Sequence, residues 1–326
     1  MATGKRIVFN ETGKPAEVLE PESFELPKPG DDEVLVRLLA APLNPADLNT
    51  IEGTYGVKPP LPATPGIEGC GAVEISGSAD FEAGDLVLFL RRAGTWASHT
   101  VMPADTLFKL PKDIDPIQAA MLKVNPATAW RLLHDFASLQ PGDWIVQNAG
   151  NSAVGRCVIQ LAASLGVRTV SFLRRPELVK ELQELGGDQV VIDDEDGRAK
   201  ALEAMGGANA VLAFNAVGGD SALRLMKLLR EGGSHVTYGA MGRKPVTVPN
   251  GLLIFRDIRI RGLWVTRWLE NADNAEAHRL YENLAGQVIA GALRQPVDAT
   301  FPLERFADAL ERLDAPDREG KVLFMP

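Results

Sequence analysis

The sequence predicts an α/β protein in which a doubly wound parallel sheet is joined to a β-rich region. Three observations lead to this fold class. Apolar strand-like runs alternate with helix-patterned runs from about residue 121 to 265, whereas short β-patterned runs broken by prolines fill residues 1–120. A glycine-containing turn connects a strand to a helix early in the alternating region. A chain of 326 residues is long for one domain, so we expect two.

Residues 1–120 are expected to form a compact β-module. Its strand-like runs lie at 34–40, 69–75, 81–88 and 95–101. Prolines recur between positions 42 and 65 and preclude long helices there. The connecting loops therefore offer places for functional side chains.

The turn between Val146 and Gly155 organises the alternating region. Gly150 can adopt a tight turn, Gly155 allows close packing of helix on strand, and Ser152 replaces the middle glycine of the dinucleotide-binding fingerprint. Such a turn directs backbone N–H groups and the positive end of the helix dipole at one point, where a phosphate can bind. An ordinary strand-to-helix connection is the alternative, because the pattern alone is weak evidence.

Two arginines end the next strand, Thr169–Leu173, about twenty residues beyond Gly155. An NAD-binding unit places Asp or Glu at this position, on the ribose 2′-hydroxyl. Arg174 and Arg175 instead suit a 2′-phosphate, because guanidinium groups pair with phosphates. We therefore expect NADPH as the cofactor. The alternative is a strand end that merely carries solvated charges.

The remaining patterns complete the sheet. A helix opens at Pro176, and another begins with Asp220 or Ser221 as its cap, runs through Arg230 and ends at Gly232-Gly233. The later strands are expected at 190–192, 210–215, 235–239 and 258–264.

From residue 266 the pattern is helical until a last strand at 321–324. We therefore expect a β-rich catalytic domain at 1–120, a cofactor domain at 121–265 and a return segment at 266–326 that completes the first domain.

Composition excludes several functional classes. The net charge of −9 argues against partners such as nucleic acid or anionic membranes, and no apolar run is long enough to span a bilayer. Cys70 and Cys157 are too few for a disulfide framework, and the start of the chain has no signal-peptide pattern, so we expect a cytoplasmic protein with reduced thiols. The four histidines lack metal-ligand spacing, so we expect no metal.

Several stretches together carry a resemblance to a known family. The domain order resembles the medium-chain dehydrogenase/reductase superfamily, and the motifs are similar to those of its NADPH-dependent mitochondrial-type 2-enoyl thioester reductases. The resemblance implies a GroES-like catalytic domain and a Rossmann cofactor domain. The motifs are Asn44–Asn49 with Gly53–Gly56, Val124–Ala129, Leu139–Asp143, Gln147–Ala149 with Asn151-Ser152, and Arg261–Trp264 with Trp268.

The same resemblance implies a zinc-independent enzyme. Asn44 stands where zinc-dependent alcohol dehydrogenases have a cysteine ligand, and Ile67-Glu68 replaces a His-Glu pair. Without a metal, the substrate must accept the electrons itself, as an enoyl thioester does when hydride adds to C3 and an enolate forms. Tyr55, which matches the family's proton donor, is the candidate that protonates C2. The alternative is that Tyr55 only lines a loop.

Other positions match the family's cofactor contacts. For the apolar members of this set, core packing is the competing interpretation. The family's phosphate site often has the pattern Arg-Asp-Arg, which is Arg174-Arg175-Pro176 here. The candidate cofactor-binding residues are Asn125, Gly150, Asn151, Ser152, Ala153, Val154, Gly155, Arg174, Arg175, Tyr238, Gly239, Ala240, Met241, Leu263, Trp264, Val265 and Lys321.

Two other functions stay open. One is a zinc-independent NADPH:quinone reductase, and the other is NADPH binding without catalysis. Asp257, Arg259 and Arg261 share one strand face, which is either solvated or a surface for CoA phosphates or an acidic acyl carrier protein. A homodimer is expected from the resemblance alone.

Overall fold

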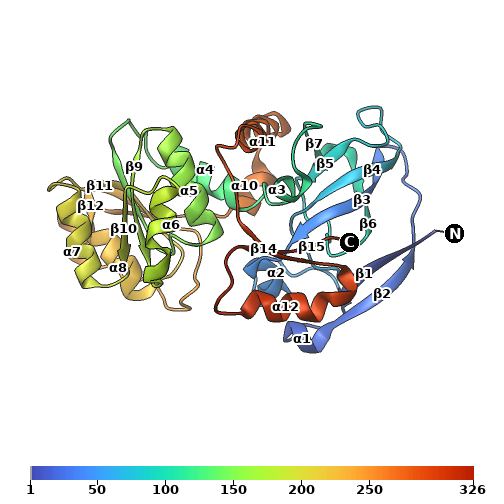
Figure 1. Ribbon diagram of the computed structural model, residues 1–326, viewed down its shortest axis with the longest axis horizontal. Helices are drawn as coiled ribbons and strands as arrows, with labels where there is room; N and C mark the ends of the chain where they lie inside the picture. The colour runs from blue at the N-terminus through green and yellow to red at the C-terminus, as the bar shows by residue number, and fades with distance from the viewer. Residues whose placement is uncertain (1) are drawn as a thin grey trace. The chain divides into compact units, whose positions relative to one another are not determined.

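The computed structural model describes residues 2–326 and divides the chain into two compact units (Figure 1). Unit 2 is one continuous stretch, Asn125–Val265. Unit 1 combines the chain up to Val124 with Thr266–Pro326, so the last part of the sequence folds with the first.

Unit 2 contains a parallel sheet with strand order β10-β9-β8-β11-β12-β13. Relabelled from one to six in chain order, this is the doubly wound order 3-2-1-4-5-6, so the predicted fold class is confirmed. The order reverses between β8 and β11, which is where such sheets bind ligands. The strands are β8 (Trp144–Gln147), β9 (Arg168–Leu173), β10 (Gln189–Ile192), β11 (Ala210–Asn215), β12 (Leu229–Thr237) and β13 (Arg259–Gly262).

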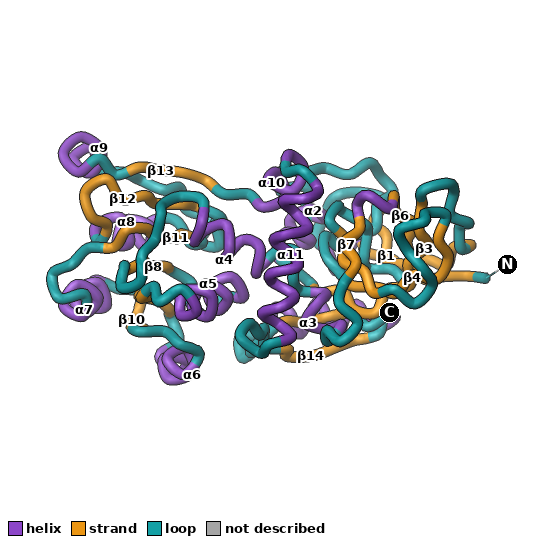
Figure 2. Tube along the Cα trace, turned by 90° about the horizontal axis from the view of Figure 1, so that it is seen from above, coloured by secondary structure: helices purple, strands orange, loops and turns teal. Residues whose placement is uncertain are grey.

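Helices cover both faces of this sheet (Figure 2). Core side chains such as Val146, Phe172 and Leu225 are buried between the sheet and the helices. Apolar residues recur at helical spacing in α5, which makes one face available for this packing. The helices are α4 (Asn125–His134), α5 (Ala153–Ser164), η2 (Pro176–Leu178), α6 (Val179–Glu184), α7 (Glu195–Ala204), α8 (Gly219–Lys227) and α9 (Asn250–Arg256).

Unit 1 is built on a largely antiparallel sheet of order β14-β15-β3-β4-β5-β7, with β6 also paired to β3, and a two-stranded sheet β1-β2. The last strand, β15, pairs with β3, so the return segment completes this sheet. The strands are β1 (Thr3–Phe9), β2 (Leu19–Glu25), β3 (Glu33–Pro42), β4 (Cys70–Ser76), β5 (Leu86–Phe89), β6 (His99–Pro103), β7 (Leu107–Lys109), β14 (Val297–Phe301) and β15 (Lys321–Phe324).

Helices connect these strands. The hydrophobic core of unit 1 includes Phe9, Trp96 and Phe324. The Trp96 and Phe324 rings meet edge to face at 5.2 Å, which ties the chain end to the centre of the unit. The helices are α1 (Pro15–Val18), α2 (Pro45–Ile51), η1 (Ala104–Thr106), α3 (Pro116–Ala120), α10 (Val265–Asn271, which begins at the last residue of unit 2), α11 (Asn274–Ile289), η3 (Leu303–Arg305) and α12 (Phe306–Asp314).

Some predicted boundaries are wrong. The helix expected to run to Arg230 ends at Lys227, and β12 begins at Leu229 and includes Gly232-Gly233. Its cap is Gly218, with φ 90°, rather than Asp220 or Ser221. The two-stranded sheet β1-β2 was not predicted.

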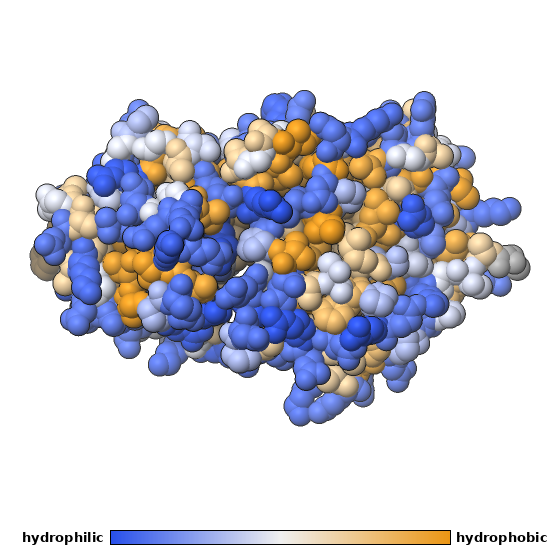
Figure 3. Space-filling model, viewed as in Figure 1, coloured by the Kyte–Doolittle hydropathy of each residue, from blue (hydrophilic) through white to orange (hydrophobic). Residues whose placement is uncertain are grey.

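The molecular face drawn in Figure 3 is mainly hydrophilic, with scattered hydrophobic patches. The most exposed large apolar side chains lie on α9, where Ile254 and Phe255 are 70% and 79% exposed. No helix within residues 2–326 has the length and apolar content needed to cross a membrane.

Candidate active site

The predicted phosphate-binding turn of unit 2 joins β8 to α5. Ala149, rather than Gly150, takes the left-handed conformation, with φ 50°. Ser152 is the N-cap of α5, where its hydroxyl accepts a hydrogen bond from the Gly155 N–H at 3.2 Å. Helix α5 therefore begins directly after this turn, and the first backbone N–H groups of a helix are the ones that can bind an anion.

Gly150 and Gly155 are required by close packing. A Cβ atom at Gly150 would lie 2.7 Å from the Ser171 Cβ, and one at Gly155 would lie 2.6 Å from the Gly150 carbonyl oxygen. Arg156 supports the same turn, because its Nε donates to the Asn151 carbonyl at 3.2 Å. The turn is therefore packed tightly against β9 and against its own backbone, and a Cβ at either position would disturb it.

A buried amide pair lies where the strand order reverses. The Asn148 Nδ2 atom donates to Asn215 Oδ1 at 2.8 Å, and Asn148 Oδ1 accepts from the Ala216 N–H at 2.7 Å. Asn215 Nδ2 donates to Thr237 Oγ1 at 3.1 Å. These bonds fix the carboxyl ends of β8, β11 and β12 to one another.

The network continues to the end of β10. Asn148 Nδ2 also donates to Ser221 Oγ at 2.8 Å, and Ser221 donates to Asp193 at 2.5 Å. Arg224 pairs with the same Asp193 carboxylate at 2.8 Å. No role was predicted from the sequence for Asn215, Asp193 or Arg224. The available signal was the polar residues that directly follow β10 and that end β11.

The predicted 2′-phosphate site follows β9. Arg174 is exposed, whereas the Arg175 side chain is 29% exposed and pairs with Glu177 through Nε at 2.7 Å. Arg175 also lowers the pKa of Glu181, behind the stronger effect of Arg156. Arg175 therefore interacts with two carboxylates, Glu177 directly and Glu181 on α6 through its charge.

The later strand ends hold the other candidates of unit 2. Tyr238 follows β12 and Leu263 follows β13, where the Leu263 N–H donates to the Thr237 carbonyl at 3.0 Å. Met241 is 58% exposed and Val265 is buried. Trp264 is half-buried, and Gly239 and Ala240 lie between Tyr238 and Met241 in the loop that leaves the sheet edge.

The buried polar atoms without a hydrogen-bond partner among the described residues of unit 2 include two that belong to predicted cofactor-binding residues. They are Asn125 Nδ2, at the start of α4, and the Tyr238 hydroxyl. Burial raises the pKa of Tyr238, although the nearby Ser152 hydroxyl opposes this shift. Unsatisfied buried donors are rare in folded proteins, and together with the glycine turn before α5 they fit a bound dinucleotide.

The predicted proton donor of unit 1 lies just beyond α2. The Tyr55 N–H donates to the Asn49 carbonyl at 3.0 Å, which fixes the loop to the helix, and the ring is half-buried. The Arg92 guanidinium carbon lies 5.9 Å from the centre of the Tyr55 ring. This distance is within the range of a cation–π contact.

A buried polar cluster surrounds the N-terminus of α2. Asn44 Oδ1 accepts from Lys321 Nζ at 2.5 Å, and Asn44 Nδ2 donates to Glu68 Oε1 at 2.8 Å. Lys321 also donates to the Leu43 carbonyl at 3.1 Å. The Asn44 amide, at the position where zinc-dependent relatives have a cysteine ligand, is thus held between the Lys321 ammonium and the Glu68 carboxylate. Lys321, predicted as a cofactor contact, lies in this cluster.

Further charges belong to the same cluster. Asp47 accepts from the Ile67 N–H at 2.9 Å, and Lys123 Nζ donates to the carbonyls of Ile67 and Arg91 at 2.6 and 2.8 Å. Burial raises the pKa of Asp47 to about 6 and lowers the pKa of Lys123 to about 7. Burial also raises the pKa of Glu68, although Lys321 opposes this shift. Lys123 and Arg92 were not predicted from the sequence.

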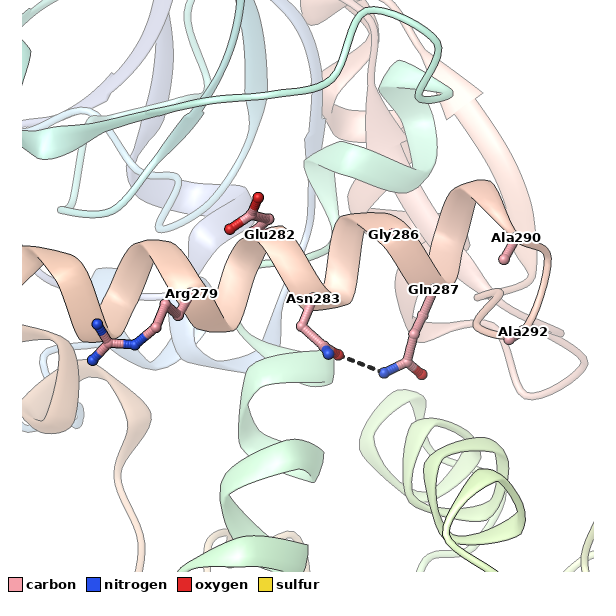
Figure 4. Close-up of a pocket in the computed structure, with 7 residues that line it drawn as sticks. All are labelled: Arg279, Glu282, Asn283, Gly286, Gln287, Ala290 and Ala292. Atoms are coloured by element: carbon pink, nitrogen blue, oxygen red, sulfur yellow. Dashed lines mark hydrogen bonds between the residues drawn. The ribbon is translucent and has the colours of Figure 1, made fainter.

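A shallow hollow on α11 has none of the predicted site residues. Figure 4 shows its lining, in which Gln287 donates to the Asn283 side chain at 2.7 Å. The lining residues are Arg279, Glu282, Asn283, Gly286, Gln287, Ala290 and Ala292. We assign no chemistry to it.

Comparison with known proteins places the chain in a family. Residues 30–112 match the alcohol dehydrogenase GroES-like domain, and residues 153–283 match the zinc-binding dehydrogenase model. The chain is also 39% identical to the mitochondrial enoyl-[acyl-carrier-protein] reductase of Xenopus tropicalis, over 98% of this chain and 94% of that protein. This chain belongs to the medium-chain dehydrogenase/reductase superfamily. The predicted family and its GroES-like and Rossmann domains are therefore confirmed.

Solved structures of this superfamily cover the whole chain. The crystal structure of a protein provisionally named NADPH:quinone reductase, from Bacillus thuringiensis, has a TM-score of 0.92 and 30% identity, with 100% of both chains covered. The 2-enoyl thioester reductase Etr1p/Etr2p heterodimer of Candida tropicalis has a TM-score of 0.88 and 31% identity, again with 100% coverage of both. An Etr1p complex with NADP and crotonyl-CoA is equally similar.

One expectation is overturned by these relatives. The Xenopus tropicalis protein and the related Homo sapiens and Arabidopsis thaliana proteins are all named as mitochondrial. The predicted cytoplasmic location is therefore contradicted. It rested on the cysteine content and on the lack of a recognisable targeting pattern, and neither feature determines the compartment in which a protein acts.

Proposed function

We propose that this chain reduces the C2=C3 double bond of trans-2-enoyl thioesters, carried by CoA or an acyl carrier protein, with NADPH as the hydride donor. The observation that carries the proposal is the similarity of the whole chain to enoyl reductases, one of them solved with NADP and crotonyl-CoA. The Tyr55 loop and the two arginines that follow β9 support it.

The proposed cofactor site belongs to unit 2. Gly150, Asn151, Ser152, Ala153, Val154 and Gly155 would hold the pyrophosphate at the start of α5. Arg174 and Arg175 would bind the 2′-phosphate, and Asn125 would use its unpartnered Nδ2 near the nicotinamide. The strand-end residues Tyr238–Met241 and Leu263–Val265 would line the same edge, and Lys321 would act from β15. When bound, NADPH supplies a hydride.

Tyr55 would complete the reaction. Addition of hydride to C3 leaves an enolate, and the Tyr55 O–H would transfer its proton to C2. A phenolic O–H is a proton donor, so this proton can pass to a strongly basic carbanion. The hydrogen bond from the Tyr55 N–H to Asn49 keeps the backbone of the donor fixed to α2.

The test compares acceptors with NADPH oxidation as the readout. We expect oxidation with crotonyl-CoA and trans-2-decenoyl-CoA, and a fall in kcat of about 10²- to 10⁴-fold in Tyr55→Phe, because positioned acid catalysis has this magnitude. Residual activity would reflect protonation by water. The same experiment with 1,4-benzoquinone tests the second candidate function, which the structural similarity to the Bacillus thuringiensis protein favours.

Two outcomes would contradict the proposal. Oxidation with the quinone but with neither thioester would assign the chain to the quinone reductases. Tight NADPH binding without oxidation by any acceptor would favour a binding role. If thioester turnover is unchanged in Tyr55→Phe, Tyr55 is not the proton donor, but the proposed reaction still stands.

We also propose a homodimer formed through unit 2. The edge strand β13 is exposed along its length, and the neighbouring α9 exposes Ile254 and Phe255. An open edge strand beside apolar side chains is a suitable surface for a second copy. Arg259 pairs with Asp257 at 3.1 Å on this edge, so the predicted arginine row is partly neutralised.

A further inference from the structure

Arg92 contacts both Tyr55 and the helix that precedes it. Its guanidinium carbon lies 5.9 Å from the Tyr55 ring centre, and its Nη2 atom donates to Thr50 Oγ1 on α2 at 3.5 Å. One cation therefore lies beside the ring of the proposed proton donor and beside the helix that carries its loop.

The loop that carries Arg92 is anchored on both sides. The Arg91 carbonyl accepts from the buried Lys123 ammonium at 2.8 Å, and Thr95 Oγ1 donates to the Glu68 carbonyl at 2.6 Å. Gly66 packs so closely that a Cβ there would lie 2.3 Å from Thr95 Oγ1. Arg92 is therefore presented from a constrained backbone and not from a free surface loop.

The proposed proton transfer changes the charge of the Tyr55 ring. The Tyr55 O–H bond breaks, a C–H bond forms at C2, and the negative charge passes from the enolate to the phenolate. Solvent water then returns a proton to the phenolate. A guanidinium attracts a neutral aromatic face weakly and a phenolate much more strongly. Its stabilisation therefore increases as the proton leaves, which is the condition for accelerating that step.

We propose that Arg92 is a positioning residue for Tyr55 that holds the phenol ring and stabilises the phenolate formed when Tyr55 donates its proton. This inference rests on the proposed enoyl thioester reductase activity.

A different role for Arg92 must be separated from this one. The buried Asp47 carboxylate lies near enough to the guanidinium for Arg92 to lower its pKa, against the larger effect of burial. Arg92 as a counter-ion of Asp47 would support α2 whatever residue stands at position 55. Arg92 as a partner of the phenolate requires the Tyr55 hydroxyl.

The experiment is a double-mutant cycle with crotonyl-CoA as substrate. Arg92→Gln is made in the unsubstituted protein and in the Tyr55→Phe background, which keeps the ring and removes only the hydroxyl. We expect kcat to fall about tenfold in the first case and less than about twofold in the second, since the interaction is with the phenolate charge. The KM for NADPH should stay within about twofold in both. Arg92→Lys should recover part of the loss.

Arg6→Gln is the matched control. Arg6 also lies in unit 1, and its guanidinium carbon is 5.1 Å from the Phe24 ring centre on the β1-β2 sheet. The substitution removes the same kind of contact and should leave kcat unchanged. Thermal unfolding of each variant identifies any loss caused by misfolding.

Equal losses from Arg92→Gln in both backgrounds would overturn the inference and leave Arg92 as a counter-ion of Asp47. Turnover that is slowed by Tyr55→Phe but not by Arg92→Gln would also overturn it, without affecting the proposed function. Failure of the unsubstituted protein to reduce any enoyl thioester would overturn both.

Discussion

His235 makes the stability of unit 2 depend on pH. It lies in β12 between Ala213 of β11 and Ile260 of β13, and it is fully buried. Neither ring nitrogen has a hydrogen-bond partner among the described residues. Burial lowers its pKa from 6.5 to about 4, because an imidazolium in this core would be unsolvated.

The sign of the effect follows from proton binding. Below pH 6.5 the unfolded chain protonates this histidine, whereas the folded protein keeps it neutral until the pH nears 4. The unfolded state therefore binds more protons in this window, and the free energy of unfolding falls as the pH falls. With these two pKa values, the contribution of His235 drops by about 2 kcal/mol between pH 7.5 and pH 5.0.

His235→Leu removes the titration and keeps an apolar side chain of similar size in the core. Urea unfolding at pH 7.5 and pH 5.0 measures the free energy of unfolding of both proteins. We expect the unsubstituted protein to lose about 2 kcal/mol more than the variant over this interval. Asp47 and Glu68, whose raised pKa values act in the opposite direction, are present in both proteins and cancel in the comparison. Parallel pH dependences would refute the assignment, whatever constant cost the substitution adds.

Two further predictions concern the cofactor site. Gly155→Ala places a Cβ 2.6 Å from the Gly150 carbonyl oxygen, so we expect the Kd for NADPH, measured by fluorescence titration, to rise at least about tenfold. Gly286→Ala on α11, where a Cβ meets nothing within 4 Å, is the control and should leave the Kd unchanged; equal binding by both variants would contradict the role of Gly155. Arg174→Ala and Arg175→Ala should each raise the KM for NADPH about tenfold and leave the KM for NADH unchanged, because a charge-assisted hydrogen bond contributes about 1.5–3 kcal/mol. Equal changes in the KM for the two nucleotides would show that neither arginine recognises the 2′-phosphate.

Local sequence patterns were sufficient for much of the fold. The alternation of strand and helix in unit 2 and the glycine turn before α5 follow from neighbouring residues, and they were predicted correctly. The β1-β2 sheet was missed because β2 is mostly exposed and polar, with Pro21 inside it, so it lacks the apolar alternation that marks a strand. Gly232-Gly233 predicts a helix end, but both residues lie within β12.

The polar clusters could not be predicted because they depend on contacts between distant residues. Lys321 and Asn44 are 277 positions apart, and Asn148 and Ser221 are 73 apart. The family resemblance pointed to Asn44, Tyr55 and Lys321 but not to Lys123 or Arg92, whose roles appear only when the loops are packed against α2. The glycine pattern likewise identified the turn but not the left-handed Ala149 within it.

The discontinuity of unit 1 has a consequence for how the chain can acquire its structure. Every strand of the parallel sheet lies within one uninterrupted segment, so unit 2 has all of its partners once residue 265 has been synthesised. Unit 1 depends on β15, since Phe324 packs against Trp96 and Lys321 provides the ammonium next to Asn44 and Glu68. Until those last residues emerge from the ribosome, Glu68 lacks the Lys321 ammonium and Trp96 lacks the Phe324 ring. The order of synthesis therefore favours completion of unit 2 before unit 1.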